Sequence, residues 1–499
     1  MFSRCTVHFH RVSLNEPAIV NTTLEILSRF WPHLSAICIL AALFTSGHAL
    51  LHKRDSRAAA LWVGIVWLVP ALGPFLYITL GINRIRRRAV SLGVHNVISR
   101  PLPENFGEPE QIEAQHLRML SRVVSRVVAQ SLVPGNTIQP LVNGDEAFPA
   151  MLAAIESAEK TISLCTYIFD NDASGGEFVS ALGRAVKRGI EVRVLVDAAG
   201  ARYSWPSIMH KLRREKIPCA RFLPSSIFAP WRVATINLRN HRKILAVDGR
   251  TGFSGGINIR RGNVLARNPP RPIQDLHFRF EGPAVVQLQE AFVNDWAFTT
   301  GEVLEGDNWF PESVESGDVV ARVIVDGPDA DFEKLRWTFL AALAEAQTSV
   351  QIVTPYFLPD AAIITALNLA ALRAVRVDIL LPAKNNLPFV HWASRAMWWQ
   401  VLERGCHLWL TPPPFDHSKL MIVDGHWVLV GSANWDARSL RLNFELNVEC
   451  YGRDFARQMG KIVEQKLKGA REVTLPDVDA RPVACRLRDA ATRLFAPFL

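Results

Sequence analysis

The pattern His-x-Lys-x-x-x-x-Asp occurs twice in this chain, and the second copy follows the first at an offset of 176 residues (417 minus 241). The two copies consist of His241, Lys243 and Asp248, and of His417, Lys419 and Asp424. Each is followed in register by Gly-Gly or Gly-Ser and then by an asparagine, Asn258 or Asn434. A duplication in such strict register predicts a chain built from two structurally similar halves.

Segments of strand length and helix length alternate around each motif. The expected strands are 161–169 and 191–197 in the first half and 350–357 and 376–381 in the second, with helices at 176–188 and 360–373. Strands that are almost wholly apolar are typical of a parallel or mixed sheet covered on both faces. We therefore expect an α/β fold of two similar halves, each with a mixed β-sheet flanked by helices.

Composition along the chain predicts six parts. They are an N-terminal segment (1–33), two transmembrane helices or a hairpin (34–83), a basic and polar connector (84–135), the first half (136–320), the second half (321–480) and an amphipathic tail (481–499). The connector is expected to contain one amphipathic helix, 112–130. The tail is expected either to dock on the body or to lie on a membrane. Its apolar stripe consists of Val483, Leu487, Ala490, Leu494 and Phe498.

Two uncharged apolar segments, 34–51 and 58–82, are each close to the length of about 20 residues that crosses a bilayer as a helix. A cleaved signal peptide does not explain the second, longer segment, so membrane insertion is the better interpretation. Pro70 and the pair Gly73-Pro74 should kink or break the second helix, which leaves a re-entrant hairpin open.

Arginines flank these segments. Arg84, Arg86, Arg87 and Arg88 follow the second, and the loop between the segments carries fewer basic residues than the two ends. The positive-inside tendency then predicts that both ends, and with them the body of the protein, are cytoplasmic. The net charge of +9 suits an anionic partner, either nucleic acid or an anionic bilayer.

The residue types of the motif are those of phosphoryl transfer. Histidine serves as a nucleophile or general acid/base near neutral pH, and a lysine two residues on lies on the same face of a strand and neutralises phosphate oxygens. Asn258, Asn434 and Ser432 are candidate phosphate-binding residues, and the glycines allow close approach to substrate.

The aspartates of the motif, Asp248 and Asp424, complete the candidate catalytic set. Because each begins an Asp-Gly turn at a strand end, we expect them to hold the loop rather than to touch substrate. A metal site is disfavoured, because each histidine is partnered by a lysine and the acidic residues lack ligand spacing. The sequence Asp170-Asn171-Asp172 is interpreted as a turn into the next helix rather than a calcium loop.

Taken together, the paired motifs resemble those of the phospholipase D superfamily. More narrowly, the stretches 354–360 (TPYFLPD) and 431–445 (GSANWDARSLRLNFE), with the two-segment N-terminus, resemble bacterial cardiolipin synthases. The similarity covers almost the whole chain. It implies one site at the interface of the two halves, no metal or cofactor, and a phosphohistidine intermediate.

The resemblance also assigns roles. His241 would be the nucleophile and His417 the acid/base, by the order usual in the superfamily. Glu445 would orient His417 through its second ring nitrogen, and Asp275 is the candidate for His241. The Asp275 assignment is the looser one, because it follows its asparagine by 17 residues (275 minus 258) and Glu445 by 11 (445 minus 434).

Two departures from symmetry bear on the site. Gly256 stands where the second half has Ser432, so the first half lacks one hydroxyl. Asp416 directly precedes His417, and strand alternation places it on the opposite face unless the chain curls into the site.

The implied function is a membrane-bound phosphatidyltransferase of the bacterial inner membrane. It would use phosphatidylglycerol and other anionic phospholipids, form cardiolipin and release glycerol, with no nucleic acid as partner. A phospholipase D hydrolase, or a transferase using another donor or acceptor such as phosphatidylethanolamine, shares all the same residues. A nuclease fits the basic charge but not the apolar anchors, and a non-catalytic scaffold would need neither histidine.

Overall fold

The computed structural model describes residues 16–53, 56–81, 112–128, 130–224, 238–328 and 331–496. The chain divides into two compact units, Met1–Arg84 and Ile85–Leu499. The arginine cluster 84–88 lies outside the described residues.

The N-terminal unit is a helical hairpin. It consists of α1 (Glu16–His52), α2 (Ser56–Leu68), α3 (Leu72–Leu76) and a π-helical turn, η1 (Tyr77–Gly81). Helix α1 packs against α2, and His48 Nδ1 lies 2.8 Å from the Tyr77 hydroxyl. Within the described residues one helical stretch, Trp31–His52, is long and apolar enough to cross a membrane.

The second apolar segment is broken, as its prolines predict. Helix α2 ends at Leu68, before Pro70, and the chain resumes as α3. A Cβ atom on Gly73 would lie 2.6 Å from the Ile65 carbonyl oxygen, so the turn requires glycine there. The described part of the predicted 58–82 segment, up to Gly81, is therefore a short helix followed by a folded-back turn.

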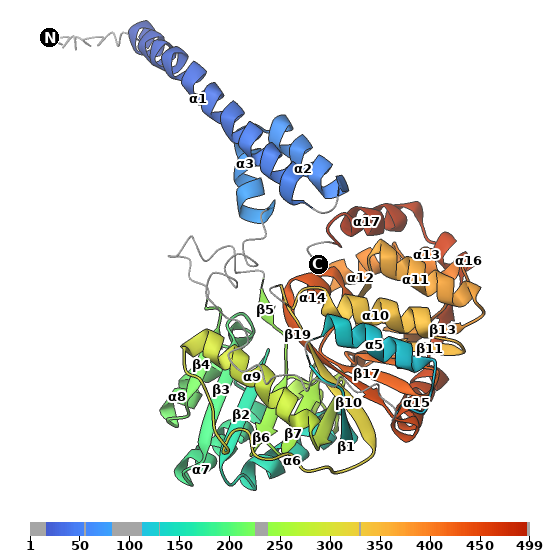
Figure 1. Ribbon diagram of the computed structural model, residues 1–499. Helices are drawn as coiled ribbons and strands as arrows, with labels where there is room; N and C mark the ends of the chain where they lie inside the picture. The colour runs from blue at the N-terminus through green and yellow to red at the C-terminus, as the bar shows by residue number, and fades with distance from the viewer. Residues whose placement is uncertain are drawn as a thin grey trace, which may run out of the picture. The chain divides into compact units, whose positions relative to one another are not determined.

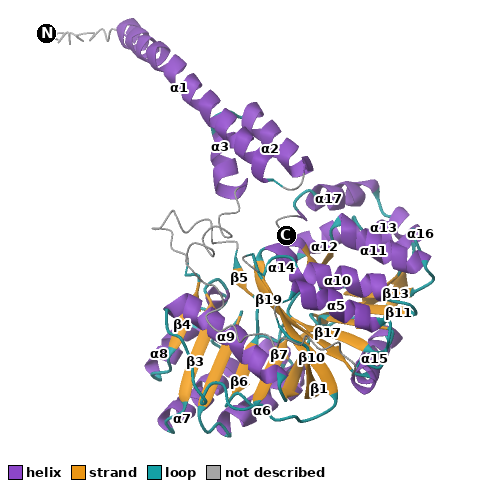
Figure 2. Cartoon of the chain, viewed as in Figure 1, coloured by secondary structure: helices purple, strands orange, loops and turns teal. Residues whose placement is uncertain are grey.

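The larger unit is built on one continuous 16-stranded sheet (Figures 1 and 2). The first half contributes β1 (Val133–Val142), β2 (Thr161–Thr166), β3 (Glu191–Asp197), β4 (Cys219–Phe222), β6 (Ile244–Val247), β7 (Thr251–Gly255) and β9 (Leu276–Glu281). The second half contributes β10 (Val319–Asp326), β11 (Ser349–Val353), β13 (Arg376–Pro382), β14 (His407–Thr411), β16 (Leu420–Val423), β17 (Trp427–Gly431), β19 (Asn443–Tyr451) and β20 (Arg471–Val473).

Strand order repeats between the halves. The sequence β4-β3-β2-β6-β7-β9-β1 in the first half corresponds to β14-β13-β11-β16-β17-β19-β10 in the second, with β20 added at the outer edge. In each half the three outer strands of this series run parallel and the motif strand, β6 or β16, pairs antiparallel with its neighbours. The expected mixed sheets and duplicated halves are confirmed. The halves join through the antiparallel pair β1–β10.

Helices cover both faces of the sheet, as the alternation of apolar residues on the strands requires. Ile244 belongs to a core shared by both halves, whereas its neighbour Leu245 faces the first half's own core. The shared core packs under α9 (Ala284–Thr300) and α15 (Arg453–Lys468). The opposite faces are covered by α6 (Asn143–Glu156), α7 (Ala173–Lys187) and α8 (Ile208–Arg214), and by α5 (Leu117–Val127), α10 (Lys334–Glu345), α11 (Ala361–Leu372), α12 (Pro388–Arg395) and α13 (Trp399–Leu402).

The connector contributes more to the fold than its polarity predicted. Helix α5 lies within the expected 112–130 and packs on α10 as part of the second half's helical layer. Ser125 on α5 accepts a hydrogen bond from the buried Arg322 guanidinium (2.7 Å), which also forms an ion pair with Glu449. Because Arg322 is buried on β10, this contact fixes the helix to the sheet.

Candidate functional site

Each motif histidine is held by a short strand that crosses to the opposite half. His241 follows β5 (Arg239–Asn240), which pairs parallel with the start of β19. His417 follows β15 (Phe415–Asp416), which pairs parallel with β8 (Ile273–Gln274). The His241 N–H donates to the Phe444 carbonyl (2.8 Å), and the His417 N–H donates to the Gln274 carbonyl (2.7 Å). These bridges bring both histidines to the junction of the halves.

The carboxylates that orient the histidines are exchanged between the halves. His241 Nδ1 lies 2.9 Å from Glu445 Oε2, and His417 Nδ1 lies 2.7 Å from Asp275 Oδ2. Glu445 and Asp275 were expected to serve His417 and His241, respectively, and that pairing is wrong. The reason is the strand exchange: each histidine's amide binds the residue directly before the opposite half's carboxylate.

The two imidazoles face each other across one small region. Their ring centroids are 6.5 Å apart and the rings are inclined at 81°. The Tyr167 ring packs 5.1 Å from His241, and the Tyr356 ring packs 6.2 Å from His417. Because Nδ1 of each ring is bound to a carboxylate, Nε2 is the nitrogen left for chemistry.

Both motif lysines are buried beside the histidines. Lys243 Nζ donates to the His241 carbonyl (2.6 Å), and Lys419 Nζ donates to the His417 carbonyl. Burial lowers the pKa of Lys243 to about 7 and that of Lys419 to about 8, although Glu445 and Asp275 act in the opposite direction. An anion bound between them would restore their charge, which is how a phosphate site is expected to behave.

Burial also shifts the pKa values of the histidines and of Asp275. It lowers the pKa of His241, against the raising effect of Glu445, and lowers the pKa of His417 well below its ordinary value, helped by Lys419 and Lys243. Burial raises the pKa of Asp275 to about 6, whereas His241 and Lys243 hold the pKa of Glu445 below its ordinary value. Burial thus favours the uncharged form of both imidazoles.

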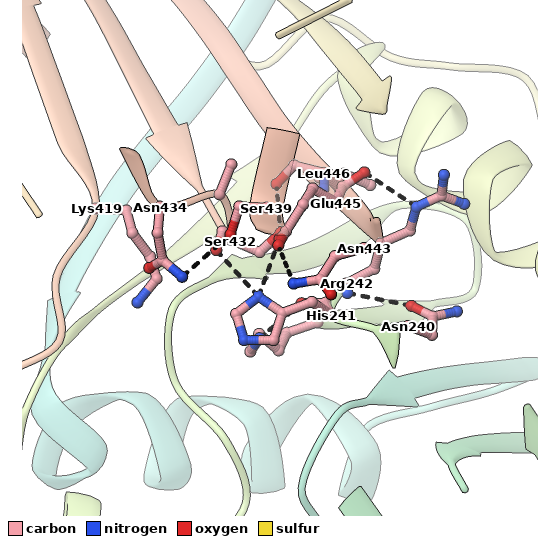
Figure 3. A network of polar contacts seen from close by, with 12 residues as sticks. Asn240, His241, Arg242, Lys419, Ser432, Asn434, Ser439, Asn443, Glu445 and Leu446 are labelled. Atoms are coloured by element: carbon pink, nitrogen blue, oxygen red, sulfur yellow. Dashed lines mark hydrogen bonds and ion pairs between the residues drawn. The ribbon is translucent and has the colours of Figure 1, made fainter. Parts of the chain in front are cut away.

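The Gly256–Ser432 difference has a steric cause. A Cβ atom on Gly256 would lie 2.1 Å from Asp275 Oδ1, so only glycine leaves room for that carboxylate. In the second half Ser432 Oγ donates to Glu445 Oε2 (2.5 Å) and accepts from the Leu446 N–H (3.0 Å) (Figure 3). Ser432 was expected to contact phosphate. It is instead fully buried and holds Glu445.

The asparagines differ in their contacts. Asn258 Oδ1 accepts from the Ile168 N–H (3.1 Å), which leaves its NH₂ group as the remaining donor. Asn434 Nδ2 lies 3.1 Å from Ser439 Oγ, and its Oδ1 is buried without a hydrogen-bond partner. Figure 3 shows the contact between Asn434 and Ser439. The assignment of both asparagines as phosphate ligands stays a prediction, in which their NH₂ groups would be the donors.

Asp248 and Asp424 lie at the far ends of β6 and β16 from the histidines, where they organise loops. Asp248 accepts from the N–H groups of Glu159, Lys160 and Thr161 at 2.7–2.9 Å. Asp424 accepts from those of Gln347, Thr348 and Ser349 at 2.7–2.9 Å. These contacts give the two aspartates the loop-holding role expected from the Asp-Gly turns and remove them from the reacting groups.

Two further acidic positions face away from the site. Asp416 Oδ2 binds Lys466 Nζ (2.6 Å) and its Oδ1 accepts from Ser418, so alternation holds and it does not enter the site. Asp172 caps α7 by accepting from the Gly175 N–H, which confirms that this sequence is a turn into a helix.

Several supporting residues carry no signal in the sequence. Asn443 Nδ2 donates to Glu445 Oε1 (3.0 Å), so three side chains fix that carboxylate. Arg242, between the motif His and Lys, donates to Asp295 Oδ1 on α9 (2.6 Å) and to the Glu445 carbonyl (3.1 Å). Asp295 lies 53 residues along the chain from Arg242 within an ordinary-looking helix, so spacing alone does not reveal it.

A solved structure shares the fold of this chain. The fold matches the crystal structure of phosphatidylserine synthase from Haemophilus influenzae with a TM-score of 0.60, covering 76% of this chain and 100% of that one at 15% identity. At this identity the likeness shows the fold alone.

Sequence comparison narrows the class. The family model described as "Cardiolipin synthase, PLD-like domain" matches residues 151–296 and 339–467, and the chain belongs to this family. Cardiolipin synthase of Oceanobacillus iheyensis is 31% identical over 461 residues, covering 90% of this chain and 95% of that protein. The major cardiolipin synthase ClsA of Bacillus subtilis is 29% identical over 462 residues, with the same coverage.

Proposed function

We propose that this protein is a membrane-bound phosphatidyltransferase that makes cardiolipin from two molecules of phosphatidylglycerol and releases glycerol. The observation that carries the proposal is the pair of exchanged histidine–carboxylate contacts, which places two Nε2 atoms and two buried lysines at one interface. The near full-length similarity to named cardiolipin synthases supports the lipid substrate.

In the first step, His241 Nε2 attacks phosphorus and the bond from phosphorus to the glycerol oxygen breaks. His417 Nε2 gives its proton to that oxygen, so glycerol leaves neutral. The anchoring of Glu445 by Ser432 and Asn443 supports His241 as the nucleophile, because attack requires a fixed ring. His417 must hold a proton for this step, which the bound phosphate anion favours by raising its pKa.

In the second step, a hydroxyl of another phosphatidylglycerol attacks the phosphohistidine. His417 Nε2 takes the hydroxyl proton, the new phosphorus–oxygen bond forms and the bond to His241 Nε2 breaks. Cardiolipin leaves and both histidines return to their starting states. Lys243, Lys419, Asn258 and Asn434 would hold the phosphoryl oxygens through both steps.

One assay tests both the lipid substrate and the acceptor of the phosphatidyl group. Purified full-length protein is incubated with phosphatidylglycerol vesicles and the lipids are analysed. Cardiolipin with an equal amount of free glycerol is the expected result. Phosphatidic acid in place of cardiolipin would show that water is the acceptor, and absence of lipid turnover would contradict the proposal.

We infer that the catalytic body lies on the cytoplasmic side of the bacterial inner membrane. The apolar stretch Trp31–His52 and the arginines at positions 84–88 support this orientation. A reporter enzyme that works only in the cytoplasm should be active when it is fused after Leu499. Activity of a reporter that works only outside the inner membrane would contradict the assignment.

A further inference from the structure

The C-terminal helix α17 (Val483–Arg493) docks on the body by its polar face. Asp489 is fully buried, with Arg488 Nη2 donating to its Oδ1 (2.6 Å) and Arg481 Nη1 donating to its Oδ2 (2.8 Å). Arg395 on α12 lies 3.7 Å from the same carboxylate, and the Arg488 guanidinium lies over the Trp392 ring at 4.3 Å. Charged contacts therefore attach this helix to α12.

The apolar stripe of α17 consequently faces away from the body. Val483 is 68% exposed, Leu487 66% and Leu494 78%, and the following Phe495 is 61% exposed. An amphipathic helix normally buries its apolar face and exposes its charges. Here the arrangement is reversed, and a contiguous apolar surface left in water marks an interaction site.

Contacts link α17 to further exposed apolar residues on α12, because Trp392 packs against both Arg488 and Phe389. Leu387 and Phe389, at the start of α12, are 46% and 60% exposed. The adjacent Asn386 accepts a hydrogen bond from the Tyr356 hydroxyl (2.7 Å), and the Tyr356 ring packs against His417. The α12 end of the surface is therefore two contacts away from a reacting histidine.

The first half contributes exposed aromatic residues that lead to the other histidine. Trp205 is 92% exposed and Tyr203 61% exposed. The Tyr203 ring lies 6.2 Å from the Tyr167 ring, which packs against His241. A continuous row of contacts thus leads from Tyr203 through both histidines to Asn386.

Charge identifies the occupant of this surface. The segment 481–493 carries Arg481, Arg486, Arg488 and Arg493, and Arg395 adds a fifth arginine against the single carboxylate of Asp489. Arg486 and Arg493 are exposed and follow one another at two-turn spacing beside the apolar stripe. Apolar side chains flanked by arginines suit the headgroup–acyl boundary of an anionic bilayer.

We propose that the α17 stripe, with Leu387 and Phe389 on α12 and Tyr203 and Trp205 on the first half, is a membrane-docking face that lies in an anionic bilayer surface and opens the two-histidine site directly to lipid. This proposal rests on the proposed phosphatidyltransferase function. It explains how substrate phosphates reach buried histidines without a lipid leaving the bilayer.

A photo-crosslinking residue placed at position 487 of the full-length protein tests the contact directly. The protein is reconstituted in vesicles of phosphatidylglycerol and phosphatidylcholine and irradiated. A lipid adduct at position 487 is expected. The matched control is position 314, because Val314 is equally exposed (67%) and lies in the segment next to the Asp248–Gly249 turn, at the end of β6 far from His241. An adduct to protein instead of lipid at 487, or equal lipid adducts at both positions, would overturn the proposal.

Activity gives an independent readout. Leu487→Glu should lower turnover of phosphatidylglycerol in vesicles by about tenfold and leave turnover of a short-chain, monomeric phosphatidylglycerol within about twofold. Val314→Glu should affect neither. Equal turnover of vesicles by Leu487→Glu and the unsubstituted protein would contradict the docking face, whereas failure of the unsubstituted protein on both substrates would contradict the proposed function itself.

Discussion

The buried carboxylates Glu445 and Asp275 each serve the histidine of the other half, so neither half holds a complete site. A carboxylate on Nδ1 fixes the tautomer and orientation of the ring and stabilises the imidazolium when it forms. At the scale of single residues, substitution of one carboxylate should therefore affect one histidine only, His241 for Glu445 and His417 for Asp275.

Glu445→Gln should lower turnover by about 10²-fold or more, because the amide keeps the shape but loses the negative charge. Nitrogen NMR should show the altered ring signals at His241 and leave those of His417 largely unchanged. Asp275→Asn should do the reverse. Perturbation of the histidine in the carboxylate's own half would disprove the exchanged pairing.

The lysines predict a pH dependence of substrate binding. The pKa of Lys243 is lowered to about 7 and that of Lys419 to about 8, so each loses its charge as pH rises through those values in the empty site. A phosphodiester keeps one negative charge over this range. Affinity for short-chain phosphatidylglycerol should therefore fall between about pH 7 and pH 9, measured by calorimetry. Unchanged affinity across that range would show that the lysines do not bind the phosphate.

At the scale of elements, the close packing of β7 against β9 imposes glycine at position 256. Gly256→Ala should displace Asp275, since the added Cβ would lie 2.1 Å from Oδ1, and should reduce turnover by about tenfold or more. Gly460→Ala on α15 is the control, because nothing lies within 4 Å of its Cβ and alanine favours the helix. Turnover per folded molecule is measured for both variants. Equal losses in Gly256→Ala and Gly460→Ala would show that the position of Asp275 does not depend on Gly256.

The turns at the far ends of the motif strands stabilise the fold and take no part in the reaction. Asp424→Ala leaves three backbone N–H groups without their acceptor, so the free energy of unfolding should fall by roughly 1–3 kcal/mol. Denaturant titration measures this loss. Turnover per folded molecule should stay within about threefold, and a loss comparable to that of His417→Ala would make Asp424 part of the reaction.

The elements that the sequence predicted are those with a repeated motif or a periodic apolar pattern. The apolar runs located β2, β3, β11 and β13, and the prolines located the break after α2. The two-residue strands β5, β8 and β15 have no periodicity to detect, so the exchange of carboxylates could not be foreseen. The amphipathic pattern of α17 was evident, but the pattern does not say which face docks, and buried Asp489 reverses the usual answer.

At the scale of the whole molecule, the duplication forms one sheet and one site. The strands β1 and β10 join two similar halves, and the short bridges β5–β19 and β15–β8 cross between them. Because the crossing is symmetric, both histidines receive nearly equivalent surroundings. This symmetry is why the motifs alone leave the nucleophile unassigned. The difference that favours His241 comes from Ser432 and Asn443 beside Glu445, where the other half has Gly256 beside Asp275.

The most direct test of the two-histidine mechanism is to identify the histidine that carries phosphorus. The protein is quenched in alkali during turnover of phosphatidylglycerol, because phosphohistidine is stable there, and the modified peptide is located by mass spectrometry. Because alkali removes the acyl chains, the expected result is a phosphorus-bearing adduct on His241 and none on His417, with increased accumulation in His417→Ala if resolution is slowed more than formation. Phosphorus on His417, or continued turnover by His241→Ala, would contradict the proposed mechanism.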